Sequence, residues 1–169
     1  MGKLKGTKAI LKVVNEFTQS FGIKAVWGEE FIAMPSDMKI RFTVVIDNAL
    51  HKCFLEDCER RFPEVHAHIF LWLLMHEIGH CMTTDAWEVD DTWYFLKAKK
   101  KLRRYIMNGS DDIDTITYHL NEIYHAFPDE FLATKWAGEY MGNHPKKMQK
   151  FNKKLNKAMI KFIQKNSIE

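Results

Sequence analysis

The spacing of apolar residues predicts an early helix followed by a short β-rich region. Between residues 3 and 21 the apolar positions recur every three or four residues, as on an amphipathic helix, and Gly22 provides a stop. The segments 25–27, 31–34 and 39–46 are short and rich in β-branched or aromatic residues. We therefore expect one helix and about three strands in this part of the chain.

From residue 48 onward the pattern predicts helices only. Pro63 suits the first turn of a helix that runs to about Met82. Further helices are expected at about 86–107, 113–126, from Pro128 to a stop at Gly142–Pro145, and at about 146–165. No repeat or low-complexity linker interrupts the pattern. We expect residues 1–169 to form a single α+β domain, mostly helical, with a small sheet of about three strands.

Composition narrows the class of protein without naming a partner. Hydrophobic residues make up 46% of the 169 residues and charged residues 28%, and the net charge is +3, as in an ordinary globular protein. Three cysteines, Cys53, Cys58 and Cys81, are too few for a disulfide framework and favour a reducing compartment. No apolar run approaches the length of a membrane span, and no signal peptide is recognised. We expect a cytoplasmic protein without a membrane partner.

The strongest chemical signal is the segment His76-Glu77-Ile78-Gly79-His80, which follows a run of seven apolar residues at 69–75. Four residues along an α-helix rotate by about 400°, so both histidines lie on one face. Two imidazoles placed in this way bind one Zn²⁺, and the intervening glutamate serves as a general base. The segment therefore predicts a zinc site with His76 and His80 as ligands and Glu77 as the catalytic base.

A catalytic zinc site requires a third protein ligand. The pattern of the metzincin peptidases is excluded because Thr83 and Ala86 stand where that pattern has glycine and histidine. A deformylase-like site would use an upstream cysteine, but Cys53 lacks the expected flanking residues, and Met75 replaces the expected glutamine. A carboxylate further along the chain is the remaining choice.

Glu130 is the best candidate for this carboxylate. It falls in the first turn of the helix that begins at Pro128, in line with the small residues Ala133 and Ala137, which would allow close approach to the motif helix. Acidic residues are also common in first turns because of the helix dipole. Glu122 and Asp129 therefore remain alternatives to Glu130.

The residues HEIGH at 76–80, followed some fifty residues later by E-x-x-A-x-x-x-A from Glu130, resemble the gluzincin peptidases, most of all the small ImmA/IrrE family. The resemblance implies that His76, His80 and Glu130 bind Zn²⁺ and that Glu77 is the general base. Two positions depart from the family pattern. Thr134 replaces an Asp or Asn that commonly supports a liganding histidine, and Trp136 replaces a Phe.

This resemblance implies a zinc-dependent endopeptidase that hydrolyses a peptide bond in a protein substrate. In such enzymes the substrate lies extended along an edge strand beside the metal helix, and the segment 39–46 is the expected counterpart here. The oxyanion needs a stabilising group besides the metal. The sequence offers several candidates and does not choose among Tyr118, His119, Tyr124, His125 and His144.

Lysine-rich segments suggest a different function. One basic block spans 97–104, and lysines dominate the predicted helix at 146–165, which also has a regular apolar stripe. The simplest interpretation is a helix docked on the protein with a solvated lysine face. The alternative is a non-catalytic zincin-like domain that binds a protein or nucleic-acid partner through its basic helices.

Overall fold

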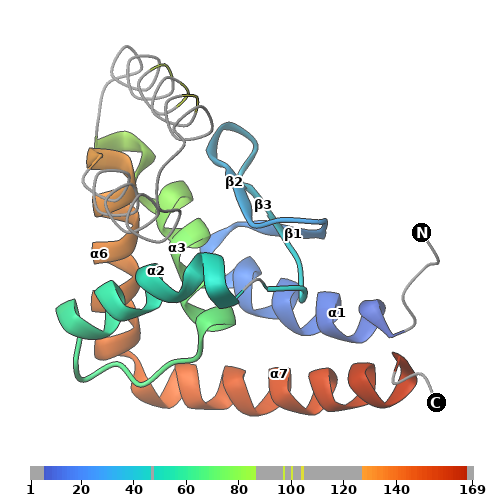
Figure 1. Ribbon diagram of the computed structural model, residues 1–169. Helices are drawn as coiled ribbons and strands as arrows, with labels where there is room; N and C mark the ends of the chain where they lie inside the picture. Colours follow the sequence, from blue (N-terminus) through green and yellow to red (C-terminus); the bar gives the residue numbers. More distant parts are fainter. Residues whose placement is uncertain are drawn as a thin grey trace.

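The computed structural model describes residues 6–46, 48–86, 97, 100, 104 and 127–166. It confirms the expected α+β class, with a mostly helical body and a small three-stranded mixed sheet that packs against α1 (Thr7–Thr18) and α3 (Ile69–Thr83) (Figure 1). The helices expected at about 86–107 and 113–126 lie outside the described residues, except for Lys97, Lys100 and Arg104, which are helical. Among the described helices, none combines the length and the apolar character needed to cross a membrane.

The first helix forms as its apolar pattern predicts. Helix α1 spans Thr7–Thr18 and continues as a single 3₁₀ turn, η1, at Gln19–Phe21. Gly22 ends it with φ of 73°, a left-handed conformation that glycine adopts without a steric penalty. The buried face of α1 carries Ile10, Val14 and Phe17.

The sheet contains β1 (Lys24–Trp27), β2 (Ile32–Met34) and β3 (Lys39–Phe42), in the order β1-β3-β2. Strand β3 pairs in parallel with β1 and antiparallel with β2. Two expectations about the segment 39–46 are therefore wrong. The strand ends at Phe42, and it lies at the centre of the sheet, where both of its backbone edges are already paired.

The helical character expected from residue 48 onward is confirmed by two helices between residues 48 and 83. Helix α2 spans Asn48–Arg61 and α3 spans Ile69–Thr83. The expected helix start at Pro63 is wrong because Pro63 lies in a turn closed by a hydrogen bond from Val65 N–H to the Phe62 carbonyl, 2.9 Å long. Proline favours the second position of such a turn as well as a first helical turn.

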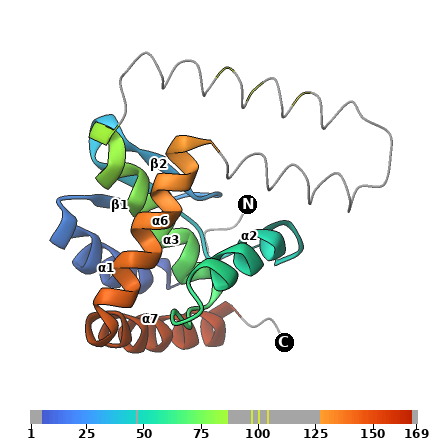
Figure 2. The same cartoon turned by 90° about the vertical axis from the view of Figure 1, so that its left-hand side faces the viewer.

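The last two described helices match their predicted bounds closely. Helix α6 spans Pro128–Asn143 and α7 spans Pro145–Asn166. Helix α3 lies at the centre of the molecule with α6 packed along it, and α1 and α7 run side by side as a separate layer (Figures 1 and 2). Every residue of α3 from Phe70 to Gly79 is buried. The motif helix is thus the core helix of the described fold.

Candidate metal centre

The two histidines of the motif face the same side of α3. Their rings meet edge to face with centroids 4.6 Å apart, and their Nε2 atoms lie 3.1 Å from each other. His76 is 5% exposed and His80 is partly buried. The expected i, i+4 juxtaposition is therefore present at a site that the buried helix holds largely away from solvent.

The close crossing of α3 and α6 brings a third donor to these histidines. A Cβ built at Gly79 would lie 2.9 Å from the Cα and from the carbonyl carbon of Ala133, closer than packed atoms tolerate. Ala133 and Ala137 are fully buried on the face of α6 turned to α3. Small residues on both helices thus allow their backbones to approach, as the sequence suggested.

Glu130 occupies the first turn of α6 and points at both histidines. Its Oε2 lies 2.9 Å from His76 Nε2 and 3.4 Å from His80 Nε2. The carboxylate is buried, with the residue only 4% exposed. Of the His, Cys, Asp and Glu residues in the described part of the chain, only His76, His80 and Glu130 form a group that could hold a metal ion.

The charge of Glu130 is stabilised by its neighbours. Burial by itself would raise the pKa of this carboxyl, but hydrogen bonds from His76 and His80 and the favourable electrostatic interaction with both rings outweigh the effect and hold its pKa well below the usual range. Glu130 is thus an anion at neutral pH. A buried carboxylate facing two imidazoles is the donor chemistry that a divalent cation requires.

The spacing of the three donor atoms suits one zinc ion. Ligand atoms about 2.0–2.1 Å from a tetrahedral Zn²⁺ lie about 3.3–3.4 Å from one another. The observed separations are 2.9, 3.1 and 3.4 Å, so only small outward shifts are needed. A tetrahedral ion held by these three donors would keep its fourth position for water or substrate.

Thr134 forms a hydrogen bond with His76 at the ring nitrogen that does not face Glu130. Its Oγ1 lies 3.0 Å from His76 Nδ1, and both residues are buried. A hydroxyl both donates and accepts. It donates to Nδ1 while Nε2–H is bonded to Glu130, and it accepts from Nδ1–H when Nε2 uses its lone pair for a metal. Thr134 therefore keeps a hydrogen bond to the histidine in either state.

Glu77 lies on the side of α3 that faces the sheet. The residue is 9% exposed, and its charge acts on the thiol of Cys81, one turn further along the same helix face. Cys81 in turn contacts the backbone of Met34 in β2 and of Lys39 in β3. Glu77 therefore lies on the side of α3 that also carries Cys81, which contacts the ends of these two strands.

Of the other candidate ligands and oxyanion-stabilising residues, two lie among the described residues and five do not. Asp129 is buried in the first turn of α6 but does not belong to the His76–His80–Glu130 group. His144 caps the far end of α6, where its Nδ1 lies 2.9 Å from the Tyr140 carbonyl oxygen. Fourteen helical residues, about 21 Å, separate it from Glu130, so it cannot serve as the oxyanion stabiliser. The remaining candidates lie outside the described residues: Tyr118, His119, Glu122, Tyr124 and His125.

One neighbour of the site was not expected from the sequence. Phe54 of α2 packs edge-on against the His76 ring, with centroids 5.3 Å apart, and it is 3% exposed. The sequence pattern does not predict this contact, because it gives no bounds for α2 and does not indicate which face of that helix packs against the motif.

Comparisons with known proteins identify no relative of this chain. No protein-family model matches the chain, and neither the curated proteins nor the solved structures give a significant match.

Proposed function

We propose that this protein is a zinc-dependent endopeptidase that cleaves a peptide bond in a protein substrate, of the gluzincin type and most like the ImmA/IrrE family. The observation that carries the proposal is the convergence of His76 Nε2, His80 Nε2 and Glu130 Oε2, which all lie within 4.8 Å of one another in a buried site. The HExxH order of the residues is the second support.

In this proposal His76 and His80 bind the ion through Nε2, Glu130 binds it through a carboxylate oxygen, and Thr134 orients His76 by accepting its Nδ1–H. A bound Zn²⁺ would lower the pKa of its water to about 7 and polarise the substrate carbonyl. The protein's own part is to hold three donors at fixed positions and to keep the fourth position open.

Glu77 is the proposed general base. It follows His76 directly, so its side chain leaves the helix about 100° from that histidine. Its carboxylate would accept the proton of the attacking water and then donate it to the leaving amine. The burial of Glu77 favours this role, because electrostatic interactions are stronger where water is excluded.

Strand β2 is the proposed docking edge for the substrate chain. Among the described residues it pairs only with β3, so it lies at the border of the three-stranded sheet, and it packs against α3. An extended peptide can add to such an edge through backbone hydrogen bonds. This assignment replaces the segment 39–46, whose central strand has no edge to offer.

Metal analysis combined with Glu77→Gln tests the proposal. Zinc is measured by mass spectrometry in the purified and the zinc-reconstituted protein, and cleavage is measured as new termini in a proteome-derived peptide library. We expect one zinc per chain in both proteins and cleavage by the wild type alone, because the glutamine cannot accept a proton. Absence of stoichiometric zinc after reconstitution contradicts the proposed enzyme. If Glu77→Gln keeps zinc and every biological effect of the wild type, the non-catalytic zincin-like domain is the better explanation.

A further inference from the structure

Charge is strongly segregated within the fold. Helices α1 and α7 together contain ten lysines and one glutamate, a formal charge of +9. The whole chain carries only +3, so the residues outside these two helices carry −6. The two helices run antiparallel along each other, as the pairs Glu16–Lys154 and Ser20–Lys147 require. One layer of the molecule is thus a cationic surface.

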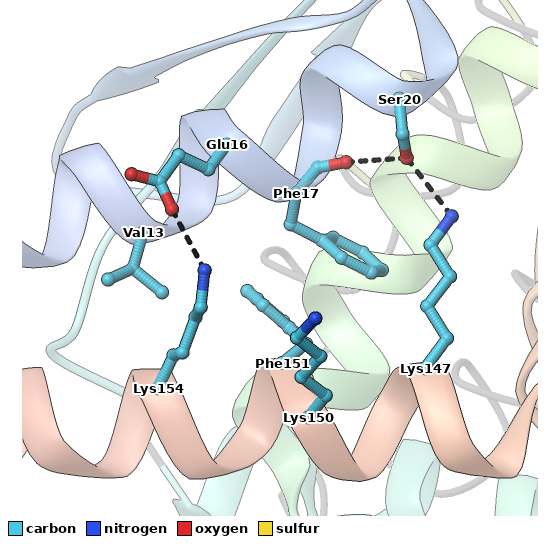
Figure 3. A pocket seen from close by; sticks show the side chains of 8 residues that line it. All are labelled: Val13, Glu16, Phe17, Ser20, Lys147, Lys150, Phe151 and Lys154. Atoms are coloured by element: carbon cyan, nitrogen blue, oxygen red, sulfur yellow. Dashed lines mark hydrogen bonds and ion pairs between the residues drawn. The ribbon is translucent and has the colours of Figure 1, made fainter.

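A groove lies between these two helices (Figure 3). It has a volume of about 250 Å³. Its floor is the accessible edge of the stacked pair Phe17 and Phe151, whose ring centroids lie 4.0 Å apart at 16° and which are 7% and 4% exposed. Val13 extends the apolar floor, and Lys147, Lys150 and Lys154 line the rim. Glu16 also lines the groove, which therefore combines an apolar base with three positive charges and one negative charge.

The cations at the two ends of the groove are held by partners from α1, η1 and α6. Lys154 forms an ion pair with Glu16 at 3.2 Å. Lys147 donates to Tyr140 Oη at 2.7 Å and to Ser20 Oγ at 3.2 Å.

Lys150 stands between these two lysines along α7 (Figure 3). Within the part of the chain that the structure describes, it makes no ion pair or hydrogen bond. The middle of the rim thus presents an ammonium group available to an anion.

The size of the groove limits what it can hold. Sites for whole drug-sized ligands usually measure about 300–1,000 Å³, and this groove is smaller at about 250 Å³. It accommodates one large apolar side chain, with the rest of the partner outside. The lysines on the rim favour a partner that carries negatively charged groups next to that apolar side chain. The combination describes a short acidic peptide segment with an apolar anchor.

We propose that the groove between α1 and α7 binds an acidic segment of a protein partner. An apolar side chain of the segment rests on the Phe17–Phe151 stack, and a flanking carboxylate pairs with Lys150. None of the lining residues belongs to α3 or α6, which carry the candidate metal centre. The proposal therefore holds whether or not the protein is a peptidase. A nucleic acid would instead contact the whole lysine face and would have no need of the apolar floor.

The test uses a fluorescein-labelled peptide with a central phenylalanine flanked by three glutamates on each side. Binding is measured by fluorescence anisotropy at about 0.1 M salt, where surface attraction is already partly screened. Lys150→Gln is expected to weaken binding about tenfold, since it removes a charge-assisted hydrogen bond. Lys153→Gln is the matched control, because Lys153 is exposed on α7 but does not line the groove. It is expected to change the affinity less than about twofold.

Three further results decide the question. A peptide with alanine in place of phenylalanine is expected to bind about tenfold more weakly, and amide shifts on peptide binding should be confined to α1 and α7. No binding, equal effects of Lys150→Gln and Lys153→Gln, or indifference to the phenylalanine would each overturn the proposal. It also fails if an oligothymidylate of equal charge binds as tightly and depends on Lys150 to the same extent, since that result indicates a general site for polyanions.

Discussion

Gly79 of α3 and Ala133 of α6 lie where the two helices cross, and a Cβ on Gly79 would stand 2.9 Å from two backbone carbons of Ala133. This contact sets the distance between the helix that carries both histidines and the helix that carries Glu130. Replacing Gly79 by alanine must therefore push α6 outward or distort α3. We expect Gly79→Ala to lower the free energy of unfolding by about 1–3 kcal/mol, as overpacked cores do, and to weaken zinc binding. Urea unfolding and a zinc titration measure both effects.

The matched control for this substitution is Gly142→Ala near the end of α6. A Cβ there meets its nearest neighbour, a Glu64 carboxylate oxygen, at 3.4 Å, which is ordinary contact. Because alanine is the better helix former, this variant should be unchanged or more stable by up to about 1 kcal/mol. Equal losses in the two variants would show that the Gly79 effect does not come from the helix crossing.

Thr134 is expected to tune the affinity for metal. Its hydroxyl is the polar partner of His76 Nδ1, at 3.0 Å in a buried position. Thr134→Val keeps the shape of the side chain but leaves Nδ1 without this hydrogen bond. We expect a loss of about 10–100-fold in zinc affinity, the usual effect of removing such a supporting partner, measured by competition with a chelating dye. Thr134→Ser keeps the hydroxyl and should stay close to the wild type. A Val variant with unchanged affinity would mean that Thr134 has no part in the site.

Glu130 is expected to be the third ligand, and alanine substitution tests this directly. Glu130→Ala should reduce zinc affinity by more than about 100-fold, beyond the typical effect of losing a supporting hydrogen bond. Glu139→Ala on the same helix is the control. Glu139 is exposed and pairs only loosely with Lys135, at 3.9 Å, and such surface pairs contribute little. Retention of zinc by Glu130→Ala would direct the search to Glu122 as the ligand.

Local patterns were sufficient to predict much of the fold. The stop at Gly22, the start at Pro128 and the lysine-rich helix to Asn166 were recognised from features within a few residues of each element. The predicted helix start at Pro63 is wrong because proline suits both a first helical turn and a β-turn. The hydrogen bond from Val65 N–H to the Phe62 carbonyl, which closes the turn, cannot be recognised from the sequence. Strand order could not be predicted, since β3 pairs with β1 in parallel and the choice of neighbours depends on packing against α3.

Part of the candidate site could likewise be predicted from local sequence, and part of it depends on tertiary packing. The juxtaposition of His76 and His80 follows from helix geometry alone. The convergence of Glu130 with them depends on a helix crossing between segments more than fifty residues apart, so the sequence left Glu122 and Asp129 open. Small residues at Gly79 and Ala133 indicated that a close crossing was feasible, but not where along α6 it would occur. The contact of Phe54 with His76 had no sequence signal at all.

The three thiols should differ in reactivity. Cys58 is fully buried, and burial together with the neighbouring Asp57 raises its pKa far above the usual range. Cys81 is 7% exposed, and burial and the charge of Glu77 raise its pKa to about 11. Only the thiolate reacts with iodoacetamide, so at pH 8 a thiol with such a pKa is about one part in a thousand reactive. Cys53 is more exposed than either.

We therefore expect iodoacetamide at pH 8 to modify Cys53 first in the native protein, with Cys58 and Cys81 modified only as the fold opens. Peptide mass spectrometry over time measures the three rates separately. In urea all three cysteines should react at similar rates, because burial no longer protects Cys58 and Cys81 or raises the pKa of their thiols. Modification of native Cys58 as rapid as that of Cys53 would contradict the packing of α2 against the core, and with it the support that Phe54 of the same helix gives to His76.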